Sequence, residues 1–273
     1  MEVTRQSHHK EIAFLFFATL ALSYYISPIF KTPQTDRQVF VYGSMTLLKG
    51  GVPYKDFFDH KPPLIYLILS VGWIFKWWGI WIVGVVAKWI AAIFLYKAAL
   101  TFLTRLSFLV PLIFLVVLLD PFIICMGSFT REYTAIFIAI TLSLILLNPG
   151  KKFVLTGVMT GLTFFTQQEE ILALCPFIIW HLFTTEKNTL QVNWGLFFKR
   201  VFQMLVGFML IFIPLVLWLY SKDALSGFWD QAFLYNFFIY RPNNPILIRI
   251  SNSLSLFYHS RIGFFILGFL IVH

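Results

Sequence analysis

Residues 200–220 read RVFQMLVGFMLIFIPLVLWLY, an apolar stretch whose charged side chain, Arg200, stands at its first position. A helix needs about 20 predominantly apolar residues to cross the hydrocarbon core of a bilayer. This stretch therefore predicts a transmembrane helix. The chain contains more stretches of the same kind.

Other apolar stretches reach or nearly reach the length of a membrane span, at 11–30, 80–100, 106–122, 133–148, 153–166 and 170–184. A last stretch at 261–273 begins with Arg261 and is too short to cross unless more chain follows it. We therefore predict an all-α integral membrane protein, a polytopic helical bundle. Residues 1–273 form its single transmembrane domain, which we expect to be truncated at the C-terminus.

The composition supports a membrane environment. Charged residues make up 12% of the chain and apolar ones 59%, whereas soluble domains contain about 25% charged residues. The mean hydropathy is +0.80. Aromatic residues reach 19%, which fits Phe against lipid and Trp or Tyr at the headgroups. We interpret the net charge of +9 as loop charge that sets orientation, so we expect membrane lipids as partners and no nucleic acid.

The distribution of basic residues predicts a topology. The stretch 62–79 is apolar but opens with two prolines and closes with an aromatic and basic interface signature. If it does not cross, Arg105 and Lys151-Lys152 lie on the side of the N-terminus, which agrees with the positive-inside rule. If it crosses, those loops move outside. We favour the first topology, with a cytoplasmic N-terminus and a first outer loop at 31–79 that carries juxtamembrane helices.

In this topology the segments 31–61, 123–132, 166–170 and 221–260 face the outside together. They contain most of the acidic residues of the chain. Acidic residues close to a bilayer core are expensive and tend to mark functional sites. We therefore expect the chemistry of the protein on the outer side. The two cysteines, Cys125 and Cys175, lie in or beside apolar runs without metal-ligand spacing and are interpreted as core thiols.

The first outer loop contains a predicted helix. Thr35 and Gln38 have the spacing of a capping box, and Gly50 or Gly51 is suited to the left-handed conformation of a helix C-terminus. Asp36 then lies in the first turn. It either acts in catalysis or only complements the helix dipole.

After this helix the sequence VPYKDFFDHKPPLIY, residues 52–66, alternates charged and aromatic residues. A lysine or histidine held at the headgroups beside prolines is suited to bind an anionic phosphate. The alternative is that Lys55 and Lys61 are interfacial anchors. Asp56, Asp59 and His60 form too short a cluster to predict a metal site, and we expect no metal or other cofactor.

The run from Asp36 through Gly50, the Pro53-Tyr54 pair and the His60-Lys61-Pro62-Pro63-Leu64 element resembles the first outer loop of the GT-C glycosyltransferases. The relatives in question are the protein O-mannosyltransferases and aminoarabinose transferases, including the RgtA/B/C/D-like bacterial branch. A weaker resemblance covers Thr130-Arg131-Glu132 and 157–168. In the latter, family members commonly have a lysine where this chain has Thr166-Gln167-Gln168.

The resemblance implies a GT-C type bundle in a bacterial inner (plasma) membrane. Its implied activity is the transfer of a sugar from a polyprenyl-phosphate donor to an acceptor on the outer face. Asp36 is then the catalytic base, Lys61 holds the donor phosphate, and Glu132 is a second catalytic carboxylate that positions sugar or acceptor. Further substrate-binding residues implied by the outer segments are Tyr54, Asp59, His60, Arg131, Tyr235, Asn236 and Tyr240.

Two other functions stay open. A transporter or flippase for lipid-linked sugars is also polytopic and basic, and Lys88 and Lys97 are charges within a predicted span. An inactive GT-C remnant fits the expected truncation and the absence of the family lysine near Gln167.

Overall fold

The computed structural model describes residues 8–30, 35–103, 106–120, 129–147, 151–183 and 193–239, without the side chains of Thr35 and Asp36. Within these residues the regular structure is helical, as predicted, apart from an isolated bridge between Pro53 and Phe57. The α-helices are α1 (His9–Ser23), α2 (Thr35–Leu48), α3 (Leu64–Trp73), α4 (Lys76–Ala99), α5 (Leu109–Leu118), α7 (Thr130–Leu147), α8 (Phe153–Thr166), α9 (Ile171–Phe183), α10 (Trp194–Ser221) and α11 (Leu225–Trp229). Short 3-10 helices follow α1 (η1, Tyr24–Ile26) and α8 (η2, Gln168–Glu170), and a π-helix follows α11 (η3, Asp230–Ile239).

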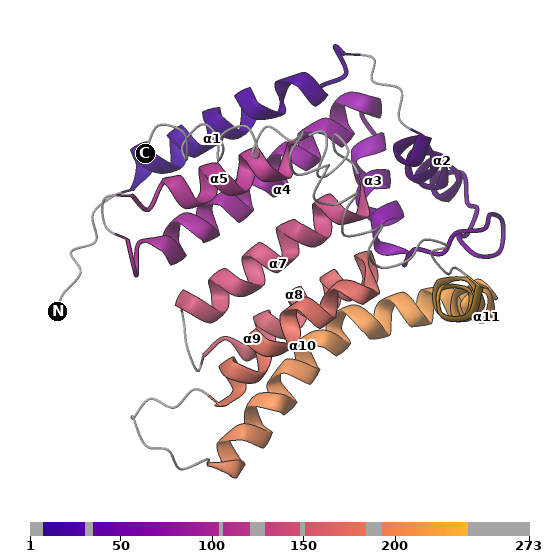
Figure 1. The fold of residues 1–273 in the computed structure, drawn as a ribbon. Coiled ribbons are helices and arrows are strands. Elements are labelled where there is room, and N and C mark those ends of the chain that lie inside the picture. Colours follow the sequence, from indigo (N-terminus) through magenta and orange to yellow (C-terminus); the bar gives the residue numbers. More distant parts are fainter. Residues whose placement is uncertain are drawn as a thin grey trace, which may run out of the picture.

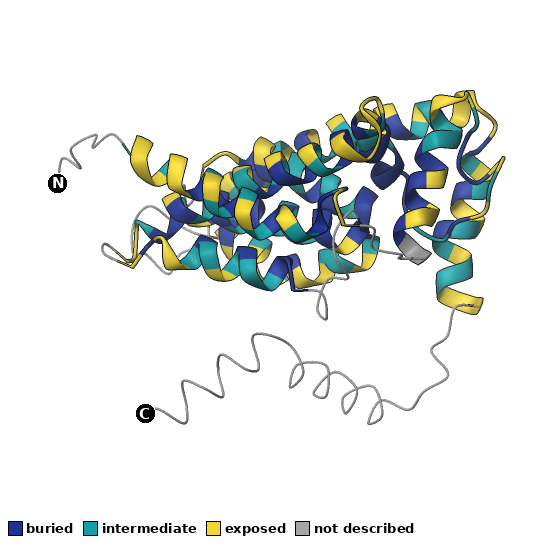
Figure 2. Ribbon diagram, turned by 90° about the horizontal axis from the view of Figure 1, so that it is seen from above, coloured by how far each residue is buried: buried dark blue, intermediate teal, exposed yellow. Residues whose placement is uncertain are grey.

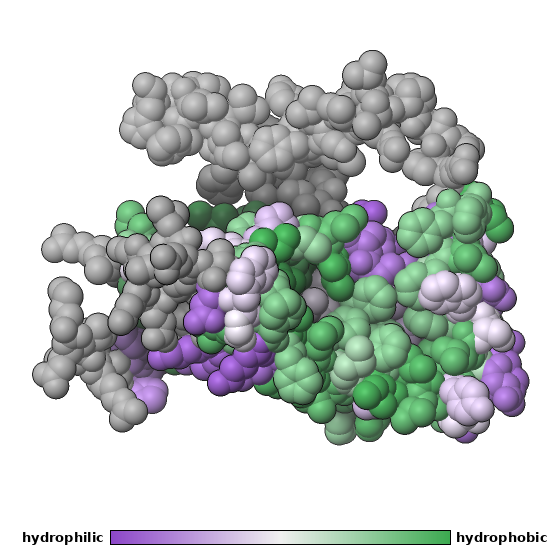
Figure 3. All heavy atoms as spheres, turned by 90° about the horizontal axis from the view of Figure 1, so that it is seen from below, coloured by the Kyte–Doolittle hydropathy of each residue, from purple (hydrophilic) through white to green (hydrophobic). Residues whose placement is uncertain are grey.

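Three of the described helices, α4, α7 and α10, are long and apolar enough to cross a membrane. Helices α3, α5 and α8 are apolar but shorter. On the face drawn in Figure 3, hydrophobic side chains form a broad area, and hydrophilic ones gather toward its two ends. This distribution fits a helical membrane protein, because lipid solvates the middle of such a bundle and water its ends.

Helices α1, α4, α5, α7, α8 and α10 lie along the length of the bundle (Figure 1). Helix α1 runs antiparallel to α4: Trp81 Nε1 donates to the carbonyl of Ser23 at 2.9 Å, and Trp89 Nε1 to that of Ile12 at 3.2 Å. Helices α2, α3 and α11 lie together at the end of the bundle that we call the α2 end. The start of α1, the end of α4 and the starts of α8 and α10 lie at the opposite end.

Helices α8 and α10 pack through glycines. A Cβ atom on Gly157 would overlap the carbonyl of Met204, and one on Gly207 would overlap that of Val154. The backbones can approach this closely because glycine has no side chain, as is common between helices in membranes. Figure 2 shows buried residues along the middle of the bundle and exposed ones on its outer surface.

The stretch 62–79 divides into two helices. Helix α3 ends at Trp73, and α4 begins at Lys76, whose φ of 55° marks the break. At 1.5 Å per residue α3 is about 15 Å long, half of the hydrocarbon core, so it is too short to cross. The helix predicted from Thr35 is confirmed, and Gly50 beyond its end has a φ of 90°. The predicted span 261–273 lies outside the described residues.

Candidate functional site at the α2 end

The loop that links α2 to α3 begins with a tight turn. The carboxylate of Asp56 accepts a hydrogen bond from the backbone N–H of Val52 at 2.6 Å, and the backbone N–H of Tyr54 donates to the carbonyl of Phe57 at 2.9 Å. Tyr54 has a φ of 69°, which is rare for residues other than glycine. Such a conformation persists where the surroundings fix it.

The Tyr54 side chain anchors this turn to the rest of the loop. Its ring is buried against Phe228 with 5.2 Å between ring centroids, and its hydroxyl donates to the carbonyl of Lys61 at 2.6 Å. Burial, and then the charge of Asp59, raise the pKa of Tyr54 well above its ordinary value. The hydroxyl therefore stays protonated and acts as a donor. This hydrogen bond holds the backbone carbonyl of Lys61 in position.

Asp59 is the centre of the hydrogen bonds that hold the loop. Its side chain is buried, and its carboxylate accepts the hydroxyl of Tyr66 and the backbone N–H of Lys61, the latter at 2.9 Å. Its backbone N–H donates to the side-chain oxygen of Gln231 in η3 at 3.1 Å. Burial and the charge of Asp59 raise the pKa of Tyr66 well above its ordinary value. Asp59 thus fixes the loop between α3 and η3.

Lys61 points toward the turn between α8 and α9. Its Nζ lies 3.1 Å from Oε1 of Glu169, which also accepts a hydrogen bond from Nε2 of Gln167 at 3.1 Å. Burial opposes ionisation of Glu169, but the charge of Lys61 and these hydrogen bonds outweigh it, so the pKa of Glu169 is lowered. Gln167, where the resembled family commonly has lysine, therefore orients the carboxylate that faces Lys61.

His60, next to Lys61 in the chain, contacts η3. Its carbonyl accepts a hydrogen bond from Nδ2 of Asn236 at 2.8 Å, and its ring centroid lies 6.1 Å from that of Tyr235. Tyr235 also packs edge-on against Phe58 at 5.1 Å. The structure therefore brings six of the predicted substrate-binding residues into one cluster, namely Tyr54, Asp59, His60, Lys61, Tyr235 and Asn236.

Glu132 of α7 is buried and is not part of this cluster. It forms an ion pair with Lys88 of α4, and both side chains are only 1% exposed. Arg37 of α2 lies near enough to interact electrostatically with Glu132, and its guanidinium stacks over Trp77 at 5.0 Å. Burial lowers the pKa of Arg37, while Glu132 and Tyr133 act in the opposite direction. The neighbouring Arg131 is exposed.

The remaining predicted residues are described only in part. The backbone of Asp36 belongs to the first turn of α2, directly before Arg37, but its side chain lies outside the described part of the structure. Tyr240 also lies outside the described residues. The catalytic roles of Asp36 and Glu132 stay predictions.

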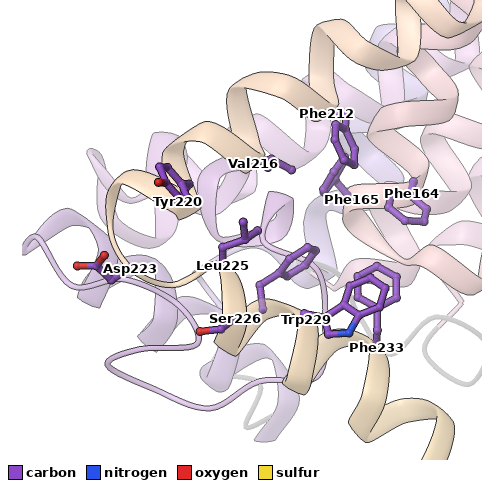
Figure 4. A pocket seen from close by; sticks show the side chains of 11 residues that line it. Phe164, Phe165, Phe212, Val216, Tyr220, Asp223, Leu225, Ser226, Trp229 and Phe233 are labelled. Carbon is purple, nitrogen blue, oxygen red and sulfur yellow. The ribbon is translucent and has the colours of Figure 1, made fainter.

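An apolar cavity of about 870 Å³ lies beside the polar cluster. Figure 4 shows aromatic side chains around it, contributed by the end of α8, by α10 and by α11 with η3. They include Phe164, Phe165, Phe212, Trp229 and Phe233. Phe233 lies less than one turn of η3 from Tyr235 and Asn236, so cavity and polar cluster share this helix.

Two residues of the α2 end, Gln231 and Gln168, could not be recognised from sequence as members of the site. Gln231 contacts both Asp59 and, through Nε2 at 2.9 Å, the carbonyl of Tyr54, but no motif distinguishes it from other glutamines. Gln168 donates to the carbonyl of Ala232 at 2.6 Å. Lys88 did carry a signal, because it is a charge within an apolar stretch, although its partner is far away in the sequence.

Comparisons with family models, curated proteins and solved structures find no match for this chain.

Proposed function

We propose that this protein is a membrane glycosyltransferase of the GT-C type that uses a polyprenyl-phosphate sugar donor. The observation that supports this best is that the apolar cavity lies against the loop that carries His60 and Lys61: Phe228 of the cavity lining packs on Tyr54, whose hydroxyl donates to the carbonyl of Lys61. A polyprenyl-phosphate sugar joins a long apolar chain to an anionic phosphate and a polar sugar. An apolar cavity next to a cation suits both parts of such a molecule.

In this proposal the polyprenyl chain lies along the aromatic lining of the cavity and its phosphate reaches Lys61. The acceptor hydroxyl loses its proton to Asp36, its oxygen bonds to the anomeric carbon, and the bond from that carbon to the phosphate oxygen breaks. The polyprenyl phosphate leaves with the electron pair. Lys61 then stabilises the charge of the leaving phosphate. In the free protein Lys61 is paired with Glu169, so the phosphate has to displace Glu169 when the donor binds.

The proposal includes an orientation in the membrane. We place the α2 end on the outer face of a bacterial inner membrane and the N-terminus in the cytoplasm. The positive-inside rule supports this orientation, because Lys10, Lys97, Lys151 and Lys152 all belong to the opposite end.

A second candidate is a transporter or flippase for lipid-linked sugars. The buried pair of Lys88 and Glu132 favours it, because charged residues within membrane helices often lie on transport paths. The third candidate is an inactive GT-C remnant. It is supported by Gln167, which stands where the resembled family commonly has lysine.

One reconstitution distinguishes these functions. The full chain is placed in vesicles with a polyprenyl-phosphate donor carrying a radiolabelled sugar, together with a membrane lipid extract as acceptor. The transferase proposal expects the label to leave the polyprenyl phosphate and to appear in a new covalent product. Passage of the intact donor across the vesicle membrane would support the flippase. Trp229, in the cavity wall, reports donor binding by fluorescence, with Trp229→Phe as its control.

A further inference from the structure

A second cavity, of about 360 Å³, lies at the opposite end of the bundle. The start of α8 and the first turns of α10 form it. Four basic residues line it, Lys151, Lys152, Lys199 and Arg200, and none of its described lining residues is acidic. Its volume falls within the range of small-ligand sites, about 300 to 1,000 Å³.

The packing of α8 and α10 produces this cavity. The two helices run parallel, because Gly157 faces Met204 and Gly161 faces Phe208. Counted back from this contact, α10 extends about two turns further toward its N-terminus than α8 does. Its first turns therefore extend beyond the start of α8. The residues before Phe153 therefore lie opposite Lys199 and Arg200. The start of α8 also directs the positive end of its dipole toward the cavity.

One of the cations is held rigidly. Arg200 is only 4% exposed, its Nη1 donates to the carbonyl of Leu182 at 2.8 Å, and its guanidinium stacks over Phe153 at 5.2 Å. The lysines, in contrast, are exposed at the cavity rim. A fixed guanidinium with exposed lysines around it is suited to a phosphate group.

The outer surface of α10 indicates which kind of molecule would carry this phosphate. Phe198 is 63% exposed and Phe202 is 66% exposed, and along α10 they flank the basic pair Lys199-Arg200. In a membrane these rings contact acyl chains, while Trp194 at the helix start is suited to the headgroup level. Acyl chains and phosphate are thus accommodated by the same two turns.

We propose that this cavity binds the phosphate headgroup of an anionic phospholipid, on the face of the membrane opposite the candidate active site. Basic pockets between membrane helices bind headgroups of this kind. A lipid headgroup and free phosphate carry the same anionic group. The apolar face beside the cavity favours the lipid, because it can also contact acyl chains. The proposal does not depend on the glycosyltransferase function.

The test uses the full chain in neutral detergent, where no charged membrane surface contributes. Native mass spectrometry measures the binding of phosphatidylglycerol and of zwitterionic phosphatidylcholine. The variant Lys152→Gln with Lys199→Gln removes two charges from the cavity. The control, Lys10→Gln with Lys97→Gln, removes two exposed charges from the same end of the bundle.

We expect one preferred phosphatidylglycerol, with an affinity at least about tenfold weaker in the cavity variant and changed no more than about twofold in the control. Equal loss in both variants would overturn the proposal, because the attraction would then depend on overall charge. Displacement of the lipid by an equal concentration of inorganic phosphate would also overturn it, because the cavity would then be a site for soluble anions.

Discussion

The ammonium group of Lys61 lies 3.1 Å from the carboxylate of Glu169 and so joins the loop between α2 and α3 to the turn between α8 and α9. The Lys61 side chain is 20% exposed and that of Glu169 is 49% exposed. An ion pair this close to solvent is weak and exchanges partners readily. In the proposed reaction, the phosphate of the donor is therefore able to replace Glu169 as the partner of Lys61.

Substitution of Lys61 tests its role in donor binding. Lys61→Ala is expected to weaken the binding of polyprenyl phosphate, because the cation proposed to hold the phosphate is removed. Lys55→Ala is the comparison: Lys55 faces the carboxylate of Asp223 at 3.7 Å, and Asp223 lines the cavity, so Lys55 is a second cation at the cavity that is not proposed to hold the phosphate. Binding is measured by Trp229 fluorescence. Equal donor affinity in the two variants would remove the case for Lys61.

The ion pair also predicts a pH dependence of stability. The pKa of Glu169 is lowered in the folded protein from an ordinary value of 4.5, so its contribution is complete above pH 4.5 and is lost as the pH falls through the lowered pKa. Glu169→Gln should therefore reduce stability at pH 7, by no more than about 1 kcal/mol because the group is half exposed. Thermal unfolding of both proteins from pH 7 downward measures this. A difference that persists unchanged far below pH 4.5 contradicts it.

Asp36 is expected to be the general base. General-base assistance contributes about 10²- to 10⁴-fold to a rate, so Asp36→Asn should lose roughly that much turnover while donor binding persists. The comparison is with Glu132→Gln, which also removes one negative charge. Near-normal transfer by Asp36→Asn, together with no transfer by a folded Glu132→Gln protein, would reverse the two assigned roles.

The buried pair of Lys88 and Glu132 predicts a stability effect of its own. Glu132→Gln leaves the ammonium of Lys88 buried without its ion-pair partner, which is expected to destabilise the protein by about 3 to 5 kcal/mol. The double variant Lys88→Met with Glu132→Leu removes both charges of the pair and should recover part of this loss, because the buried Arg37 still loses its interaction with Glu132. Unfolding in denaturant measures all three proteins. A double variant less stable than Glu132→Gln would mean that the pair stabilises the fold beyond mutual neutralisation.

The orientation is tested by labelling single cysteines in a chain that lacks Cys125 and Cys175. Lys49 is exposed at the end of α2, and Asn148 lies between α7 and α8 in the chain. A reagent that does not cross membranes should label Lys49→Cys in intact cells, and should label Asn148→Cys only after the cells are opened. The reverse pattern would place the candidate site in the cytoplasm.

The sequence by itself determined the helical class, the apolar character of α4, α7 and α10, and the start and end of α2. These depend on local properties: the length of an apolar run, capping residues and a glycine that tolerates a positive φ. The cluster of charged and aromatic residues in 52–66 could likewise be recognised, because it interrupts apolar sequence at an expected membrane surface.

The tertiary structure decided which of these residues meet. Asp59 is buried among Tyr66, Gln231 and the backbone of Lys61, and Glu132 pairs with Lys88 instead of the adjacent Arg131. Neither partner choice follows from sequence spacing, because each depends on how helices distant in the chain pack. A buried carboxylate takes the partner that the packing leaves within reach, since an unpaired charge there would be far more costly.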